Sequence, residues 1–110
     1  MIEERIRTIE ARLRDSAHLS EATRQELLEL LEALRREIAS LPESQKEEGQ
    51  SIARFAEVST HEATRPESRP RLLQAALEGL TGSVEEFEAS HPELTSTINR
   101  MALILSNMGM

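Results

Sequence analysis

The sequence predicts an all-α protein, a single domain of antiparallel helical hairpins that form a four- to five-helix bundle. Glutamate, leucine, alanine and arginine dominate the composition, tryptophan and tyrosine are absent, and valine occurs only at positions 58 and 84. Apolar residues recur in steps of three and four along four segments, the spacing of helix faces and coiled-coil seams. Because isolated amphipathic helices are marginal in water, we expect these faces to pack together, within one chain or in a dimer.

The first two apolar stripes predict helices near residues 2–14 and 21–41. A polar stretch separates them, and Ser20 is well placed to cap the helix that begins at Glu21. Pro42 ends the second helix, because proline lacks the backbone N–H and its ring clashes with the preceding turn. The stripes consist of Ile2, Ile6, Ile9 and Leu13, and of Leu27, Leu31, Leu34, Ile38 and Leu41.

The middle of the chain has a weaker pattern. A short amphipathic helix is expected near residues 51–63, where Ile52, Phe55, Ala56 and, more weakly, Val58 form the apolar pattern. Residues 42–50 and 64–70 are expected to be flexible. The first stretch contains Gly49 among glutamate, glutamine and serine residues, and the second contains two prolines that disfavour helix in the residue before them. A local basic patch, Arg65, Arg69 and Arg71 with Glu67 among them, accompanies these prolines and is interpreted as a solvated turn.

A third stripe predicts a helix near residues 70–89. Gly79 and Gly82 lie within it and weaken it by about 1 kcal/mol each relative to alanine. They either allow a close helix crossing or a bend, or are tolerated at the surface. The stripe consists of Leu73, Leu77, Leu80, Val84 and Phe87.

The last helix, near residues 91–107, has a start signal and a stop signal. Ser90 and Glu93 fit a capping box, with Pro92 in the first turn, and Asn107 and Gly109 suit a C-terminal cap. From residue 94 onward only one residue is charged. A helix so poor in charge is expected to be buried on more than one side, as a central helix or a subunit interface. Its apolar residues are Leu94, Ile98, Met101, Leu105 and Met108, with Leu103 and Ile104 beside them.

The candidates for chemistry are few. Glu88 and His91 have the Glu-x-x-His spacing of di-iron bundles, but that site needs the motif twice, and His91 lies at a helix break. Glu57 and His61 can meet on a helix surface as a simple pair, and His18 lies in a polar turn. The chain has no cysteine. We therefore expect no catalytic residue, no metal and no cofactor.

Charge and composition limit the partners. A net charge of −7 argues against nucleic acid, whose binding needs a positive surface, and two phenylalanines are too few for a base-stacking platform. No apolar run approaches the roughly 20 residues that span a bilayer, and the first residues contain no apolar signal core. The expected location is the cytoplasm of a bacterial-type cell.

The leading functional hypothesis is a non-enzymatic interaction protein that self-associates as a homodimer or binds an unidentified protein through its seams. The alternative is a peripheral membrane protein that uses its last helix as an interfacial anchor. Interfacial helices usually carry lysine and arginine on the polar face, whereas this helix offers mainly serine, threonine and asparagine. A membrane role is therefore disfavoured. A metal-dependent enzyme is the third and least favoured hypothesis.

Two parts of the sequence resemble a known family. The run Phe87–Thr95, followed by a helix that ends in Asn107–Gly109, resembles the C-terminal signature of short bacterial proteins grouped as domain of unknown function family 4404. The stretch Ser20–Leu28 is similar to that family's first hairpin, and the middle of the chain is longer than the family pattern. The resemblance implies a compact all-helical bacterial protein. It implies no activity, since the family has no assigned function.

Overall fold

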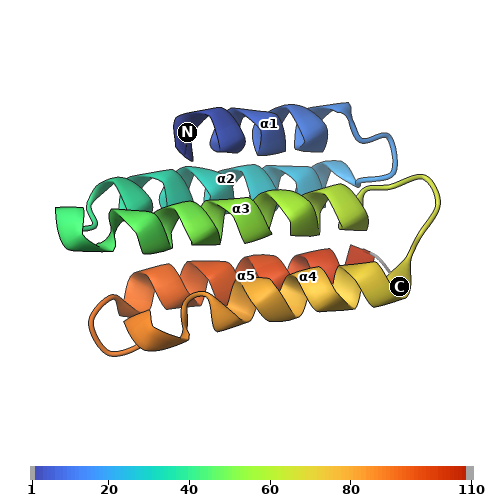
Figure 1. Cartoon of the computed structure of the whole chain (residues 1–110). Coiled ribbons are helices and arrows are strands. Elements are labelled where there is room, and N and C mark those ends of the chain that lie inside the picture. The colour runs from blue at the N-terminus through green and yellow to red at the C-terminus, as the bar shows by residue number, and fades with distance from the viewer. Residues whose placement is uncertain (1, 109–110) are drawn as a thin grey trace.

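The computed structural model describes residues 2–108 and contains, over these residues, five α-helices and no strand, which confirms the all-α prediction (Figure 1). Two short 3₁₀ turns, Glu43–Gln45 and Glu85–Phe87, lie in the connections before α3 and before α5. The helices are α1 (Ile2–Asp15), α2 (Glu21–Ala39), α3 (Lys46–Ala63), α4 (Pro70–Gly82) and α5 (Pro92–Met108).

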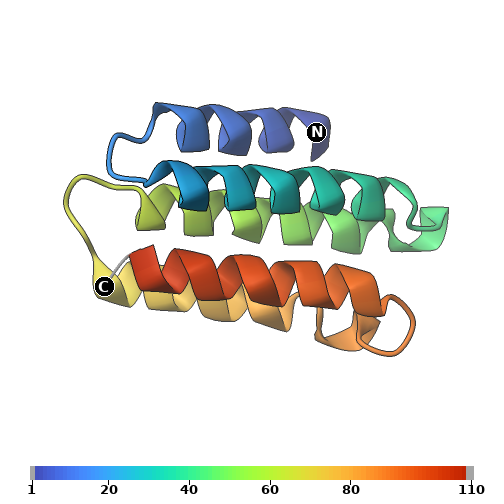
Figure 2. The ribbon, with the colours of Figure 1, turned by 180° about the vertical axis from the view of Figure 1, so that it is seen from behind.

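Successive helices run antiparallel and lie in three layers. α1 covers α2 and α3 on one side, and α4 and α5 form the layer on the other side (Figures 1 and 2). α1 makes its main contacts with α2 and α3, whereas α5 packs against α2, α3 and α4. α5 nevertheless lies beside α4 in an outer layer of the bundle (Figure 1), so the prediction of a central helix is wrong, and its apolar side is buried against three helices of the same chain.

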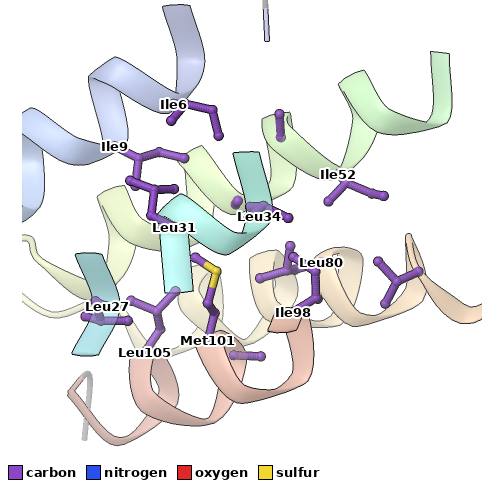
Figure 3. Close-up of a cluster of buried hydrophobic side chains, with 14 of the residues drawn as sticks. Ile6, Ile9, Leu27, Leu31, Leu34, Ile52, Leu80, Ile98, Met101 and Leu105 are labelled. Carbon is purple, nitrogen blue, oxygen red and sulfur yellow. The ribbon is translucent and has the colours of Figure 1, made fainter. Parts of the chain in front are cut away.

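The four apolar stripes meet in one core (Figure 3). Each side chain of the second stripe is buried, and the first and third stripes each leave one member, Ile2 and Leu77, partly exposed. In α5, Leu94, Ile98, Met101 and Leu105 are at most 2% exposed, and Met108 packs half-buried against the same cluster. The core is closed by helices of a single chain.

The burial of α5 differs in one respect from the prediction. Leu103 is 53% exposed, so it does not widen the buried face. Thr95, Thr97 and Ala102 are buried instead, and the two threonine hydroxyls donate hydrogen bonds to the Val84 carbonyl and to Glu37. Small polar residues with local acceptors allow α5 to contact three helices closely without an apolar residue at every contact.

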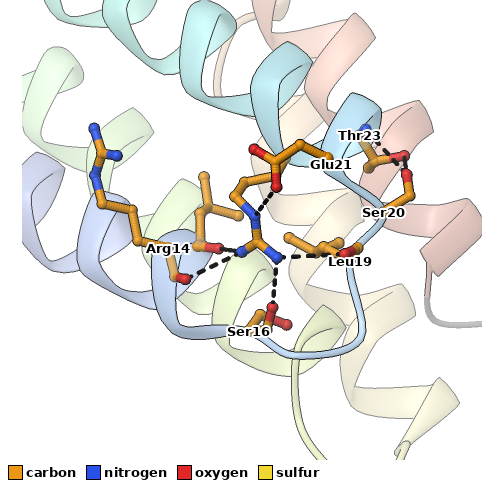
Figure 4. A network of polar contacts seen from close by, with 8 residues as sticks. Arg14, Ser16, Leu19, Ser20, Glu21 and Thr23 are labelled. Atoms are coloured by element: carbon orange, nitrogen blue, oxygen red, sulfur yellow. Dashed lines mark hydrogen bonds and ion pairs between the residues drawn. The ribbon is translucent and has the colours of Figure 1, made fainter.

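The connection between α1 and α2 begins as predicted. Ser20 caps α2, and its hydroxyl oxygen accepts a hydrogen bond from the Thr23 N–H at 3.2 Å (Figure 4). The Arg24 guanidinium then reaches back across the connection and donates to backbone carbonyls of Leu13, Arg14, Ser16 and Leu19. This arginine therefore satisfies acceptors at the end of α1, where helix carbonyls lack intrahelical partners.

The middle segment is more regular than predicted. α3 begins at Lys46, not near residue 51, so most of the stretch 42–50, expected to be flexible, folds as a 3₁₀ turn and the first turn of α3. The reason is Gly49, which is buried: a Cβ there would lie 3.1 Å from Ile38 and 3.2 Å from Leu41. The missing side chain lets α3 start against the end of α2. The connection before α4 has no regular secondary structure at 64–69, and the flexibility expected over 64–70 stays a prediction.

The predicted helix over 70–89 is shorter in the structure. α4 ends at Gly82, and Ser83 closes it with a hydroxyl that donates to the Leu80 carbonyl at 2.6 Å. The 3₁₀ turn that follows keeps Val84 and Phe87 buried, so the stripe continues past the end of the helix. The spacing of the apolar residues did not distinguish an α-helical turn from a 3₁₀ turn, because the two have similar side-chain periods over a single turn.

The predicted capping box at the start of α5 is not formed. α5 begins at Pro92, so His91 rather than Ser90 directly precedes it, and within residues 2–108 no hydrogen bond joins Ser90 to Glu93. The His91 N–H instead donates to the Phe87 carbonyl at 2.7 Å, which ties this connection to the preceding 3₁₀ turn. Pro92 occupies the first turn as predicted. The proposed cap at Gly109 lies outside the described residues.

Gly79 allows a close contact between α3 and α4. A Cβ built there would overlap the Phe55 ring. We expect Gly79→Ala to add about 1 kcal/mol of stability through helix propensity only when the ring has been removed by Phe55→Ala. In the parent protein this gain should be cancelled or reversed, since the ring must leave its position. Urea denaturation of the four variants measures this coupling, and an equal gain in both backgrounds would contradict the contact.

Candidate interaction surface

The residues predicted to form an interface lie inside the bundle. Leu94, Ile98, Met101 and Leu105 face α2, α3 and α4 of the same chain, and Met108 is half-buried beside them. A partner can reach this seam only if the bundle opens. The seam therefore explains how one chain folds.

The residues considered for chemistry are not brought together. The nearest side-chain partner of His91 is Gln45, with Nε2 and Oε1 3.2 Å apart, while Glu88 is exposed. Glu57 forms its ion pair with Arg5 at 2.5 Å rather than with His61. His18 is exposed in its turn. Over residues 2–108 no group of three or more histidine, aspartate or glutamate side chains is arranged to hold a metal ion.

Exposed apolar side chains point to α3 and α4. Over the described residues, the large apolar side chains that remain exposed are Phe55 (36%), Val58 (43%), Leu72 (47%) and Leu103 (53%). The first three belong to α3 and α4, and only Leu103 belongs to α5. Large exposed apolar residues that gather on one side of a protein are typical of interaction sites, whereas single ones need no explanation.

Helix geometry places these residues on one strip. The Phe55 ring lies against Gly79, and α3 and α4 are antiparallel neighbours. Leu72 precedes Gly79 by two turns, or about 10 Å, and exposed Ala75 lies between them. Val58 follows Phe55 by one turn in the same direction. We call the strip formed by Phe55, Val58, Leu72, Ala75 and Gly79 the α3–α4 face.

A groove continues the α3–α4 face toward the start of α3. Its volume is about 750 Å³, and it lies where Gly79 and Gly82 leave α4 without side chains opposite the Phe55 ring. Carboxylate side chains lie around the groove. The polar residues of the groove are Glu48, Ser51, Ser83, Glu85 and Glu86.

The two ends of the α3–α4 face carry opposite charge. Glu85 and Glu86 mark the acidic end, beside the groove, and both are exposed. The other end carries Arg65, Arg69 and Arg71, with exposed Glu67 among them; Arg65 is paired with Glu62 at 3.0 Å. Arg69 and Arg71 are exposed and form no ion pair within residues 2–108. The face is therefore apolar in its middle, acidic at one end and basic at the other.

A second depression lies between α1 and α3. Its volume is about 230 Å³, and Ile9, Val58 and Thr60 contribute to its lining. Its charged neighbours already have partners, since Arg12 donates to the Thr64 hydroxyl at 2.8 Å and Glu57 is paired with Arg5. These two charged side chains of the lining are therefore already engaged within the chain. This site is therefore a weaker candidate than the α3–α4 face.

A family model matches residues 2–110, nearly the whole chain. The chain belongs to the DUF4404 family. The family is described as a domain of unknown function, so membership assigns no activity to any residue. No curated protein and no solved structure matches the chain. Within residues 2–108 of this DUF4404 protein, no helix has both the length and the apolar content needed to cross a membrane.

The DUF4404 chain also contains one carboxylate with a perturbed pKa. Burial raises the pKa of Glu37 above its ordinary value of 4.5, and the nearby negative charge of Glu93 raises it further. The hydrogen bond from Thr97 and the positive charge of Arg36 lower the pKa, but burial is the largest effect. Its Oε2 accepts from the Thr97 hydroxyl at 3.1 Å, while its Oε1 is buried without a partner in the described residues. Compared with the unfolded chain, the folded state therefore favours the protonated form of Glu37.

The sign of this shift gives a pH-dependent prediction for Glu37→Gln. Because the folded-state pKa is raised, Glu37 contributes stability below pH 4.5 that is lost as pH rises through the folded pKa. We expect the variant to be slightly more stable than the parent near pH 7, with the difference vanishing below about pH 4. Urea denaturation across this pH range measures the difference, and a variant that is less stable near pH 7 would contradict it.

Proposed function

We propose that this protein is a non-enzymatic interaction module that self-associates as a homodimer. The observation that carries the proposal is the α3–α4 face, with its exposed apolar strip and oppositely charged ends. The α5 seam supports it indirectly. Since that seam is already covered by the chain's own helices, the remaining exposed apolar surface is concentrated on α3 and α4.

A membrane-surface role has less support. The apolar face of α5 packs inside the bundle, so an anchor made of this helix must first leave the core. Its outward side offers only one cation, Arg100, and that guanidinium bonds Glu26 at 2.6 Å. The overall charge of −7 also disfavours anionic lipid. A cytoplasmic location remains a prediction from the sequence.

Sedimentation equilibrium tests the proposal. We expect the average mass to rise from that of one chain, 12.4 kDa, toward twice that value as the concentration increases from about 1 µM to about 1 mM, the range of weak reversible complexes. The same experiment at raised ionic strength should weaken association, since charged ends contribute to it. A mass of one chain throughout this range would overturn self-association.

A further inference from the structure

We infer that two copies dock through their α3–α4 faces in an antiparallel, two-fold arrangement. In this arrangement Leu72 and the basic end of each copy enter the groove and acidic end of the other. The inference rests on the proposed self-association and adds the surface, the orientation and the residues that meet. It follows from the spacing, the shape and the charge of the face.

The spacing along α4 suits such an arrangement. Leu72 lies about 10 Å on one side of Gly79, and the groove extends from Gly79 on the other side, past Gly82 at the end of α4, to Glu86. A two-fold axis near Ala75 and Val58 therefore brings the Leu72 side chain of one copy over the glycines of the other. The two contacts are identical, as an isologous interface requires.

The shapes of the projecting Leu72 side chain and of the groove also suit the antiparallel arrangement. Leu72 projects, with 47% of its surface exposed, whereas Gly79 and Gly82 leave a groove of about 750 Å³ beside the Phe55 ring. An exposed leucine that fills this groove removes apolar surface of both copies from water. Val58, 43% exposed and close to the axis, meets its own counterpart.

Charge selects the antiparallel orientation. With the copies antiparallel, the end of one copy that carries Arg69 and Arg71, together with Glu67, lies toward the end of the other that carries Glu85 and Glu86, twice in the dimer. A parallel arrangement places acid against acid and base against base, which costs several kcal/mol in protein interfaces. The face itself supplies this preference, since Arg69 and Arg71 have no ion-pair partner within residues 2–108 of their own chain.

The size of the face sets the expected strength. α3 has 18 residues and is about 27 Å long, and two packed helices are about 20 Å wide, so each copy contributes roughly 500 Å². The total, roughly 1,000 Å², lies at the low end for specific protein complexes. A reversible dimer with a dissociation constant in the micromolar range is expected.

Complementary charge reversal tests the orientation. One variant carries Arg69→Glu and Arg71→Glu, and the other carries Glu85→Arg and Glu86→Arg. In each variant alone, both contacts of the homodimer join like charges, and we expect association at least about 100-fold weaker than in the parent. In an equimolar mixture both contacts join opposite charges again, so a heterodimer should form with nearly parental affinity. Sedimentation of each sample, with circular dichroism to verify folding, gives the readout.

A matched control separates the interface from net charge. Arg7→Glu with Arg14→Glu introduces the same change of charge as Arg69→Glu with Arg71→Glu, on the exposed side of α1, and should leave association unchanged. If the parent dimerises and the charge-reversed variants dimerise equally well, self-association stands and the α3–α4 face is overturned. If both variants are monomeric and their mixture stays monomeric, the antiparallel pairing is overturned. A monomeric parent overturns the proposed function itself.

The apolar contact has its own pair of variants. Leu72→Ser should weaken dimerisation at least about tenfold, since the projecting side chain is lost from the centre of each contact. Leu103→Ser removes a leucine of similar exposure from α5, outside the α3–α4 face, and should leave the dissociation constant unchanged. Equal effects of the two substitutions would overturn the docking of Leu72 in the groove.

Discussion

Replacing Met101 with glutamate should unfold the protein. Met101 is 1% exposed and lies in the middle of α5 among side chains contributed by other helices of the same chain (Figure 3). A carboxylate there has neither a cation nor water to stabilise its charge. The effective cost of burying an unpaired charge is several kcal/mol, against a total stability of about 5–15 kcal/mol for a domain of this kind.

Leu103→Glu is the matched control for this prediction. Leu103 lies two residues further along the same helix, is 53% exposed, and also changes from an apolar to an acidic residue. We expect its free energy of unfolding to stay within about 0.5 kcal/mol of the parent value, whereas Met101→Glu should lose at least about 4 kcal/mol. The two variants share a helix and a chemical change, so their difference isolates burial.

The measurement also distinguishes a core from a subunit interface. If the α5 seam closes a single chain, Met101→Glu should lose helical circular dichroism and shift its urea midpoint strongly downward. If the seam were covered by a second copy, the variant would keep its helices and change only its mass. A folded monomer with the parental melting temperature would therefore refute the packing of α5 described above. Leu105→Asp, at another fully buried position, provides a second test of the same seam.

The core could be predicted from the sequence because its signal is periodic. Four stripes with steps of three and four became one buried cluster, and the buried members of the second stripe, from Leu27 to Leu41, were each predicted. The pattern reports that a face is covered. It does not report whether the cover belongs to the same chain, and for this reason the α5 seam suggested a subunit interface that proved to be internal.

Local details that depend on tertiary contacts could not be predicted. Gly49 in an acidic, polar stretch indicated flexibility, yet its close approach to Ile38 and Leu41 makes it part of a helix. Ser90 and Glu93 have the spacing of a capping box, but α5 begins two residues after Ser90. In both cases the neighbouring segment, absent from any local pattern, decided the outcome.

The α3–α4 face shows the same limit of sequence-based prediction for exposed residues. Phe55 was assigned to a buried stripe, and Val58 was treated as a weak extension of it, but both are exposed. Leu72 lies directly before buried Leu73 and therefore off the predicted stripe. Apolar residues that do not fit the helical period were the available signal for this surface. Recognising that they share one side required the antiparallel packing of α3 on α4.

Arg24→Met should destabilise the protein by about 2 kcal/mol, mainly by loosening α1. The Arg24 side chain is 17% exposed, and its guanidinium donates to carbonyls at the end of α1 and in the connection to α2, including that of Ser16 at 2.9 Å; it also pairs with Glu21 at 3.4 Å. Methionine keeps the apolar stem but has no donor. Hydrogen bonds to charged groups contribute about 1.5–3 kcal/mol each when buried, and partial exposure of this group reduces the sum.

Arg24→Lys separates charge from geometry. An ammonium group keeps the positive charge near the carbonyl end of α1, which the helix dipole favours, but it lacks the planar fork that bonds several carbonyls at once. If the fork is the cause, lysine should recover less than half of the loss. If lysine restores full stability, the helix dipole alone explains the effect. Arg36→Met, on the exposed side of α2, is the control and should change stability by no more than about 0.5 kcal/mol.

Hydrogen exchange gives the local readout that a global measurement lacks. α1 forms an outer layer by itself and makes its main contacts with α2 and α3, so its packing depends strongly on its connection to α2. In Arg24→Met the amides of α1 should exchange faster than in the parent, while the exchange rates of α5, which packs against three helices, should change only with global stability. Unchanged exchange in α1 together with unchanged stability would show that the arginine network contributes nothing to the fold. Faster exchange confined to α1 would identify Arg24 as the residue that holds the outer helix on the bundle.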